Sequence, residues 1–154
     1  MNKFPELTTE RIESLKAGIL AASSFTLAYG ITAIGNSLIL AQQFETLADL
    51  QNTTPVTLFV RVAVAGMSGF LFGVTYRYVI RDDKNPHLKD GAVLAFGLVR
   101  GLATIEERQN LTQAFWVLGV LGIESIVCFL AARFALDWAI HQHWLKPFKS
   151  GSAS

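Results

Sequence analysis

The sequence predicts an all-α fold, a membrane-embedded four-helix bundle with both termini on the cytoplasmic side. Three observations carry this prediction: apolar runs of membrane-spanning length, few charged residues, and basic residues that gather at alternate connections. Charged residues make up 16% of the 154 residues and hydrophobic residues 51%, whereas ordinary soluble domains are about 25% charged. A soluble domain of long buried helices is the alternative, but soluble helices usually keep a polar face, and these runs mostly lack one.

Four apolar runs define the helices, at 17–41, 58–80, 88–103 and 114–136. The first, second and fourth can each cross the hydrocarbon layer, for which about 20 residues suffice. The third helix, at about 27 Å, is short but still able to span. With their flanks, the helices are expected at about 10–43, 57–81, 86–104 and 111–145, in one transmembrane domain over 1–148, and 149–154 is expected to be a disordered tail.

Capping residues and prolines set the expected helix ends. Thr9 is a suitable N-cap for the first helix, and the turn cluster that ends in Pro55 precedes the second. Asn85, followed by proline, is a good start for the third helix, and Asn110 for the fourth. Pro147 is expected to stop the last helix.

The distribution of basic residues predicts the orientation. The loop 42–57 contains no Lys or Arg, and the link near Arg108 contains one. The N-terminal segment, the connection after the second helix and the C-terminus hold the basic flanks: Lys3, Arg11, Lys16, Arg77, Arg81, Lys84, Lys89, Lys146 and Lys149. Basic flanks favour the cytoplasmic side. Four spans place all of them on that side, and three spans do not.

Small residues recur at four-residue spacing within the first, second and third helices. The second helix has Ala65, Gly69 and Gly73 on one stripe, and the third has Gly97 and Gly101. Such stripes let helix backbones approach closely. In lipid the hydrophobic effect does not drive helices together, so this close packing stabilises their association instead. We interpret them as packing faces within the bundle, and self-association between copies is the alternative.

Three charged residues lie within the predicted spans. Arg61 and Arg100 lie about 8 Å and about 6 Å inside the outer ends of their helices, and Glu124 lies about 15 Å into the fourth helix. An ionised side chain at that depth is costly, so Glu124 must be neutral, paired or facing a wet cavity. Depth alone suggests that Glu124 pairs with Arg100, or else with Arg61. We favour a structural lock that fixes helix register; the functional alternative is a proton or ion relay, or a polar site for a headgroup or cofactor.

A second charge cluster is predicted at the inner boundary. Arg133 and Asp137 are four residues apart on the last helix and can meet on one face. Arg77 and Arg81 lie at the same level on the second helix. The simpler interpretation is an interfacial salt-bridge lattice, and the alternative is a pocket for an anionic lipid headgroup.

Several chemistries find no support in the sequence. Cys128 is the only cysteine, which excludes an internal disulfide and a cysteine-based zinc site. His141 and His143 are two residues apart on a helix and point in different directions, so no metal site is expected. The net charge of +1 gives no reason to propose a nucleic acid partner. No catalytic motif is present, and nothing identifies a cofactor.

Two segments resemble uncharacterised small integral membrane proteins of cyanobacteria and plastids. They are Arg77-Tyr78-Val79-Ile80-Arg81 and Leu94-Ala95-Phe96-Gly97-Leu98-Val99-Arg100-Gly101, within about the middle third of the chain. The resemblance implies a plasma or thylakoid membrane and brings no catalytic residues with it.

The sequence therefore predicts a non-enzymatic membrane protein in contact with the lipid bilayer and with other membrane subunits. The leading function is an accessory, assembly or scaffold subunit of a larger membrane complex. The alternative is a small transporter or channel-like protein that uses Glu124 and the arginines.

Overall fold

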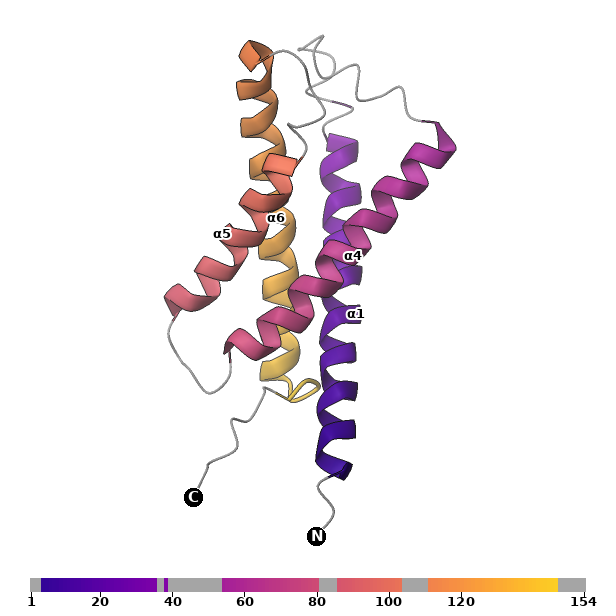
Figure 1. Cartoon of the computed structure of the whole chain (residues 1–154), viewed down its shortest axis with the longest axis vertical. Helices are drawn as coiled ribbons and strands as arrows, with labels where there is room; N and C mark the ends of the chain where they lie inside the picture. Colours follow the sequence, from indigo (N-terminus) through magenta and orange to yellow (C-terminus); the bar gives the residue numbers. More distant parts are fainter. Residues whose placement is uncertain (1–3, 36–37, 39–53, 81–85, 104–110, 147–154) are drawn as a thin grey trace.

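The computed structural model describes residues 4–35, 38, 54–80, 86–103 and 111–146. The described residues form four helices: α1 (Phe4–Gly35), α4 (Pro55–Ile80), α5 (Pro86–Ala103) and α6 (Leu111–His141). They run alternately up and down, so α1 begins and α6 ends at the same end of the molecule (Figure 1). The all-α prediction is confirmed for the described residues, which contain helices and no strands.

Three of these helices are long and apolar enough to cross a membrane, over Leu7–Gly35, Pro55–Ile80 and Gly119–His141. The shorter α5 has 18 residues and includes Lys89, Asp90 and Arg100. The predicted fourth span therefore remains a prediction.

The start of α1 differs from the prediction. The helix begins at Phe4, and Thr9 lies inside it rather than capping it. Pro5 is compatible with the first turn because the N–H that it lacks would have no intrahelical partner there. The predicted end of this helix near residue 43, the disordered tail 149–154 and the caps Asn85 and Asn110 lie outside the described residues.

The start of α4 is capped by Thr54. The Thr54 hydroxyl oxygen accepts a hydrogen bond from the Thr57 amide at 3.4 Å, and Pro55 occupies the first helical position. This position suits proline because its fixed φ is helical and its missing N–H is not needed.

The end of α6 also differs from the prediction, because the helix stops at His141, well before Pro147. His143 adopts a left-handed conformation with φ of 61°. The Trp144 amide donates to the Ala139 carbonyl at 3.0 Å, and the His143 amide donates to the Ile140 carbonyl at 3.0 Å. This hydrogen-bond pattern is a Schellman motif, which ends a helix without proline.

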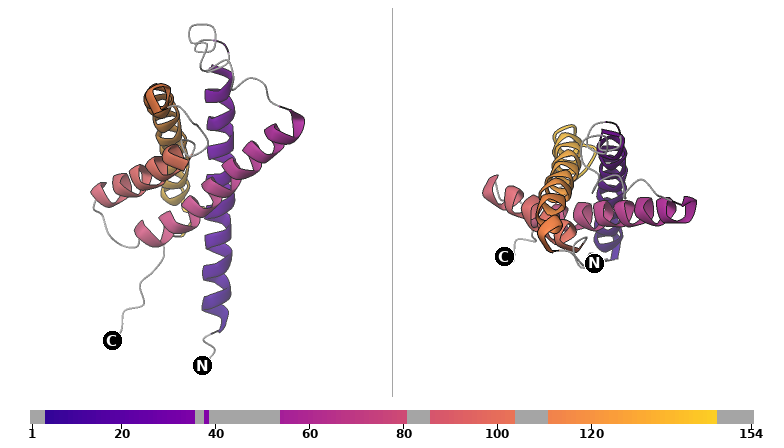
Figure 2. Two further views of the ribbon diagram at one scale, coloured as in Figure 1. Left: turned by 45° about the horizontal axis from the view of Figure 1, so that its top comes forward. Right: turned by 90° about the horizontal axis from the view of Figure 1, so that it is seen from above.

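The core forms where the four helices meet, and each contributes one phenylalanine: Phe25, Phe72, Phe96 and Phe129. The ring of Phe129 lies 4.6 Å from that of Phe25, 5.1 Å from that of Phe72 and 5.6 Å from that of Phe96, between centroids. Seen from the side and from above, α4 crosses α1 at a wide angle (Figure 2). The aromatic cluster thus joins helices that diverge away from it.

Candidate functional site

Arg77, on the last turn of α4, is the most deeply buried charged side chain of the described core, 1% exposed. Its Nη2 forms an ion pair with the carboxylate of Glu10 on α1. Its Nη1 donates to the Glu10 carbonyl at 2.9 Å and to the Ser14 hydroxyl at 2.6 Å. Burial of a charge is tolerated when it is paired and hydrogen-bonded, and Arg77 meets both conditions.

The segment after α6 closes over the same end of α1. Nε of Arg77 donates to the Lys146 carbonyl at 2.9 Å, and the Lys146 amide donates to the Glu13 carboxylate at 3.1 Å. Leu145, 3% exposed, joins the hydrophobic core. Arg77 therefore connects α1, α4 and the chain after α6.

A second ionic cluster surrounds Asp137 on α6. Its Oδ1 accepts hydrogen bonds from the Tyr76 hydroxyl at 2.9 Å and from Nζ of Lys89 at 3.0 Å. Nε of Arg133 lies 3.7 Å from Oδ2 of Asp137, and Nη1 of Arg133 forms an ion pair with Asp90. This Asp137 cluster joins α4, α5 and α6.

The single inner-boundary cluster that we expected is therefore divided in two. Arg133 and Asp137 do meet, but Arg77 faces α1 instead of α6. The reason is helix geometry: successive residues point about 100° apart, so Tyr76 reaches Asp137 while Arg77 points elsewhere. Arg81 lies outside the described residues.

Among the described contacts, Glu124 and Arg100 form no hydrogen bond or salt bridge with each other, although their charges interact at longer range. Oε1 of Glu124 accepts a hydrogen bond from the Thr32 hydroxyl at 2.9 Å, which joins α6 to α1. Nη1 of Arg100 donates instead to the Ser68 hydroxyl at 2.8 Å, which joins α5 to α4. The residues share a depth, but their side chains project toward different neighbours, and depth along a helix does not determine direction.

Aromatic rings of α1 complete the surroundings of Arg100. The guanidinium carbon lies 5.1 Å from the Phe25 ring centre and 5.6 Å from that of Tyr29. Cation–π contacts of this kind stabilise a cation, more strongly where water is excluded. Arg61, the third member of the predicted cluster, lies half-buried on α4.

The small-residue stripes lie at helix contacts. A Cβ added to Gly73 would collide with the Ala17 carbonyl of α1, and one added to Gly69 would lie 2.7 Å from the Phe25 Cβ. Ala65, at 0% exposure, continues this face of α4. On α5, a Cβ at Gly97 would lie 2.7 Å from Cγ1 of Ile126, and one at Gly101 would lie 3.0 Å from Cα of Gly122. The glycines thus bring α4 against α1 and α5 against α6.

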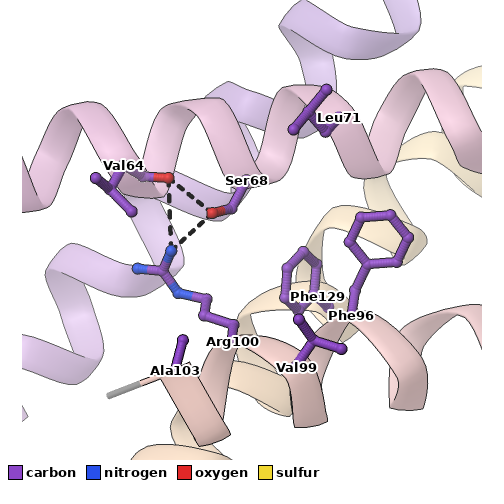
Figure 3. A pocket seen from close by; sticks show the side chains of 8 residues that line it. All are labelled: Val64, Ser68, Leu71, Phe96, Val99, Arg100, Ala103 and Phe129. Atoms are coloured by element: carbon purple, nitrogen blue, oxygen red, sulfur yellow. Dashed lines mark hydrogen bonds between the residues drawn. The ribbon is translucent and has the colours of Figure 1, made fainter. Parts of the chain in front are cut away.

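A groove of about 260 Å³ lies between α4 and α5 (Figure 3). The Arg100 side chain reaches across it to Ser68, and the Phe96 and Phe129 rings lie beyond, toward its other part. Its lining residues are Val64, Ser68, Leu71, Phe96, Val99, Arg100, Ala103 and Phe129. Within the described residues, no group of three or more His, Cys, Asp or Glu side chains could hold a metal ion.

Sequence reasoning missed the partners Glu10, Ser14 and Thr32. A signal for them exists: Glu10 and Ser14 continue the buried stripe through Ala17, Ala21 and Phe25 at steps of three or four residues, and Thr32 follows Phe25 by seven residues, or two helical turns. Residues at this spacing share one helix face. Extending the small-residue pattern in both directions along α1 would have placed all three polar side chains toward the other helices.

Comparison of the chain with protein-family models, curated proteins and solved structures gives no match.

Proposed function

We propose that this chain is an integral membrane accessory, assembly or scaffold subunit of a larger membrane complex and performs no catalysis. The observation that carries the proposal is the contrast between its interior and its surface. Buried or half-buried charged groups such as Arg77, Arg100 and Glu124 contact partners on other helices. Large apolar side chains face outward on every helix, among them Leu27, Ile31, Phe59, Met67, Val99, Ile123 and Phe134. Such faces suit lipid and neighbouring membrane subunits.

The proposed topology has four spans with both termini on the cytoplasmic side, in a plasma or thylakoid membrane. The described basic residues Arg77, Lys89 and Lys146 gather near the ends of the helices where α1 begins and α6 ends, which supports this orientation. The resemblance to membrane proteins of cyanobacteria and plastids supports the choice of membrane.

Labelling of single cysteines tests this topology. In a Cys128→Ser background, His87→Cys and Ala103→Cys place thiols at the two ends of α5, and both positions are exposed. If α5 crosses the bilayer, a membrane-impermeant maleimide labels Ala103→Cys in intact cells and labels His87→Cys only after permeabilisation. Labelling of both from the same side would contradict the fourth span.

Membership in a complex is tested by site-specific photo-crosslinking in the native membrane. A photoreactive residue at Phe134, which is 65% exposed, should give a discrete protein adduct, and the same probe at the buried Leu136 is the matched control. In mild detergent, the protein should migrate on native gels at a mass well above that of one chain together with its detergent micelle. Lipid adducts alone, together with migration as a single chain, would contradict the proposal.

A small transporter or channel-like protein is the second candidate. The Thr32–Glu124 hydrogen bond favours it, because it places an ionisable group between two apolar helices, where such groups often serve ion or proton pathways. Purified protein in proteoliposomes with a pH-sensitive dye inside should then show proton flux. Glu124→Gln should abolish this flux, and Arg11→Gln, at an exposed position, should preserve it. Equally low proton flux in the wild-type protein, Glu124→Gln and Arg11→Gln would eliminate this candidate.

A further inference from the structure

Glu124 and Thr32 meet between α6 and α1, within two of the helices that are long and apolar enough to cross a membrane. Oε1 of Glu124 lies 2.9 Å from Oγ1 of Thr32. The same Thr32 hydroxyl lies 3.0 Å from the Tyr29 carbonyl oxygen, three residues earlier on α1, and 4.0 Å from Sγ of Cys128 on α6. One hydroxyl group therefore has three polar neighbours.

The number of protons decides how these contacts can be made. A hydroxyl has one proton to donate and two lone pairs that accept. The Tyr29 carbonyl can only accept, and an ionised Glu124 could only accept as well. The single Thr32 proton cannot serve both acceptors fully, although both distances are those of ordinary hydrogen bonds. A proton on Glu124 removes this conflict.

With a neutral Glu124, each neighbour of the Thr32 hydroxyl has a compatible role. Thr32 donates to the Tyr29 carbonyl, because threonine hydroxyls in helices commonly bond the carbonyl three or four residues before them. Oε1 of Glu124 carries the proton and donates to Oγ1 of Thr32. The Cys128 thiol can donate to the remaining lone pair of this oxygen. The bond between α6 and α1 is kept, with donor and acceptor exchanged relative to an ionised Glu124.

The groups around Glu124 also favour the neutral acid. Within the described part of the chain, no cation bonds to its carboxyl, and Arg100 of α5 acts on it only at longer range. The neighbouring titratable groups on α1 and α6 are Tyr29 and Cys128, both uncharged in their protonated forms, and Arg61 of α4 acts on Tyr29. An ionised carboxylate between two apolar helices without a bonded cation is costly, and such a group takes up a proton instead.

From this geometry we infer that Glu124 is a proton-binding site: at neutral pH its carboxyl is a neutral acid that donates to Thr32 and so joins α6 to α1. Release of the proton to water leaves a carboxylate, and the Thr32 hydroxyl must then turn from the Tyr29 carbonyl toward Glu124. Binding and release of one proton are thus coupled to the hydrogen bonds between the two helices. The inference goes beyond the scaffold function, and it holds whether or not the protein moves protons across a membrane.

Infrared difference spectroscopy of the full chain in lipid vesicles tests the protonation state. The spectrum of the wild type minus that of Glu124→Gln should contain, at neutral pH, the C=O band of one carboxylic acid, and this band should shift in D2O. Asp90→Asn is the matched control: Asp90 forms an ion pair with Arg133, so its replacement should leave the acid band unchanged. A carboxylate band in place of the acid band would overturn the inference.

The same spectra test release of the proton. Alkaline titration should replace the acid band by carboxylate bands, and a return to neutral pH should restore it. An acid band that persists at the most alkaline pH at which the chain stays folded would show a permanently neutral group and would overturn the proton-binding site.

Two substitutions of Thr32 test the donor assignment. Thr32→Val removes the hydroxyl with little change of shape, so the acid loses its acceptor and its band should move to a different frequency. Thr32→Ser keeps a hydroxyl and should leave the band close to the wild-type frequency. An unchanged band in Thr32→Val would show that the Glu124 proton does not point at Thr32.

The stability of Glu124→Gln provides a readout that needs no spectrum. Glutamine is the closest uncharged substitute, because its amide N–H can donate to Thr32 as the neutral acid does. Glu124→Gln should therefore keep the wild-type unfolding temperature at neutral pH. Glu10→Gln is the matched control, since the Glu10 carboxylate pairs with Arg77, and it should lower that temperature by about 4 °C or more. A similar drop in Glu124→Gln, or its failure to fold, would show that the contact needs a carboxylate and would overturn the inference.

Discussion

At the scale of single residues, Arg77 shows how a charge can be buried in this protein. Its guanidinium meets the Glu10 carboxylate and carbonyl, the Ser14 hydroxyl and the Lys146 carbonyl. These acceptors come from three parts of the chain that are far apart in sequence. The side chain therefore stabilises the tertiary arrangement rather than one helix.

We expect Arg77→Met to lower the free energy of unfolding by about 1–3 kcal/mol, because it leaves the Glu10 and Lys146 carbonyls and the Ser14 hydroxyl without the donor that they share. Chemical denaturation in detergent, followed by circular dichroism, measures the loss. Arg11→Met is the matched control: Arg11 is exposed on α1, and its replacement should change stability by less than about 0.5 kcal/mol. Similar losses in the two variants would contradict a specific role of Arg77.

At the scale of helices, the contact between α4 and α1 depends on the absence of side chains. A Cβ at Gly73 would meet the Ala17 carbonyl and would lie 2.6 Å from the Ala21 Cβ, whereas one at Gly66 would meet only the Thr26 hydroxyl at 3.7 Å. The two glycines lie on one helix, so they share helix propensity and differ in their surroundings.

Gly73→Ala should therefore destabilise the protein by about 1–3 kcal/mol through overpacking. Gly66→Ala should be neutral or stabilising by up to about 1 kcal/mol, because alanine favours the helix and meets ordinary contacts. Thermal unfolding in a fixed detergent gives both values. An equal effect of the two substitutions would show that helix propensity, and not the contact with α1, controls this position.

The end of α6 provides a second test at this scale. His143 holds a left-handed conformation that glycine adopts without a steric cost. His143→Gly should raise stability by about 0.5–1 kcal/mol, and His141→Gly, within the helix, should lower it by a similar amount. Opposite shifts in the unfolding temperature are the expected outcome, and a lower temperature for His143→Gly would contradict the assigned Schellman motif.

At the scale of the whole molecule, the Phe129 ring contacts a phenylalanine from each of the other three helices. Packing at this point holds the helices together where they cross. In lipid, burial between helices gains little from the hydrophobic effect, so shape and dispersion carry more of the stabilisation.

Phe129→Ala should consequently reduce stability by about 3 kcal/mol, the lower end of the range for such truncations in soluble cores. Phe134→Ala is the matched control on the same helix, since Phe134 is 65% exposed. Denaturation monitored in lipid bicelles measures both, and equal losses would show that the aromatic cluster is not the centre of the bundle.

Much of this architecture could be predicted from the sequence. Apolar run length and low charge identify the helices, and Pro86 marks the start of α5 as expected. The glycine stripes identify the faces of α4 and α5 that approach other helices. These properties are local, because hydrophobicity, proline geometry and four-residue spacing act within one helix.

Only the tertiary structure decided which helix each face meets and where each charged side chain points. Glu124 and Arg100 lie at a similar depth, yet Glu124 bonds to Thr32 and Arg100 to Ser68. The position of a residue along a helix fixes its depth, but its partner depends on the rotation and crossing angle of two helices. Those angles follow from the packing of all four helices together, as at Phe129, and no single segment of the sequence contains them.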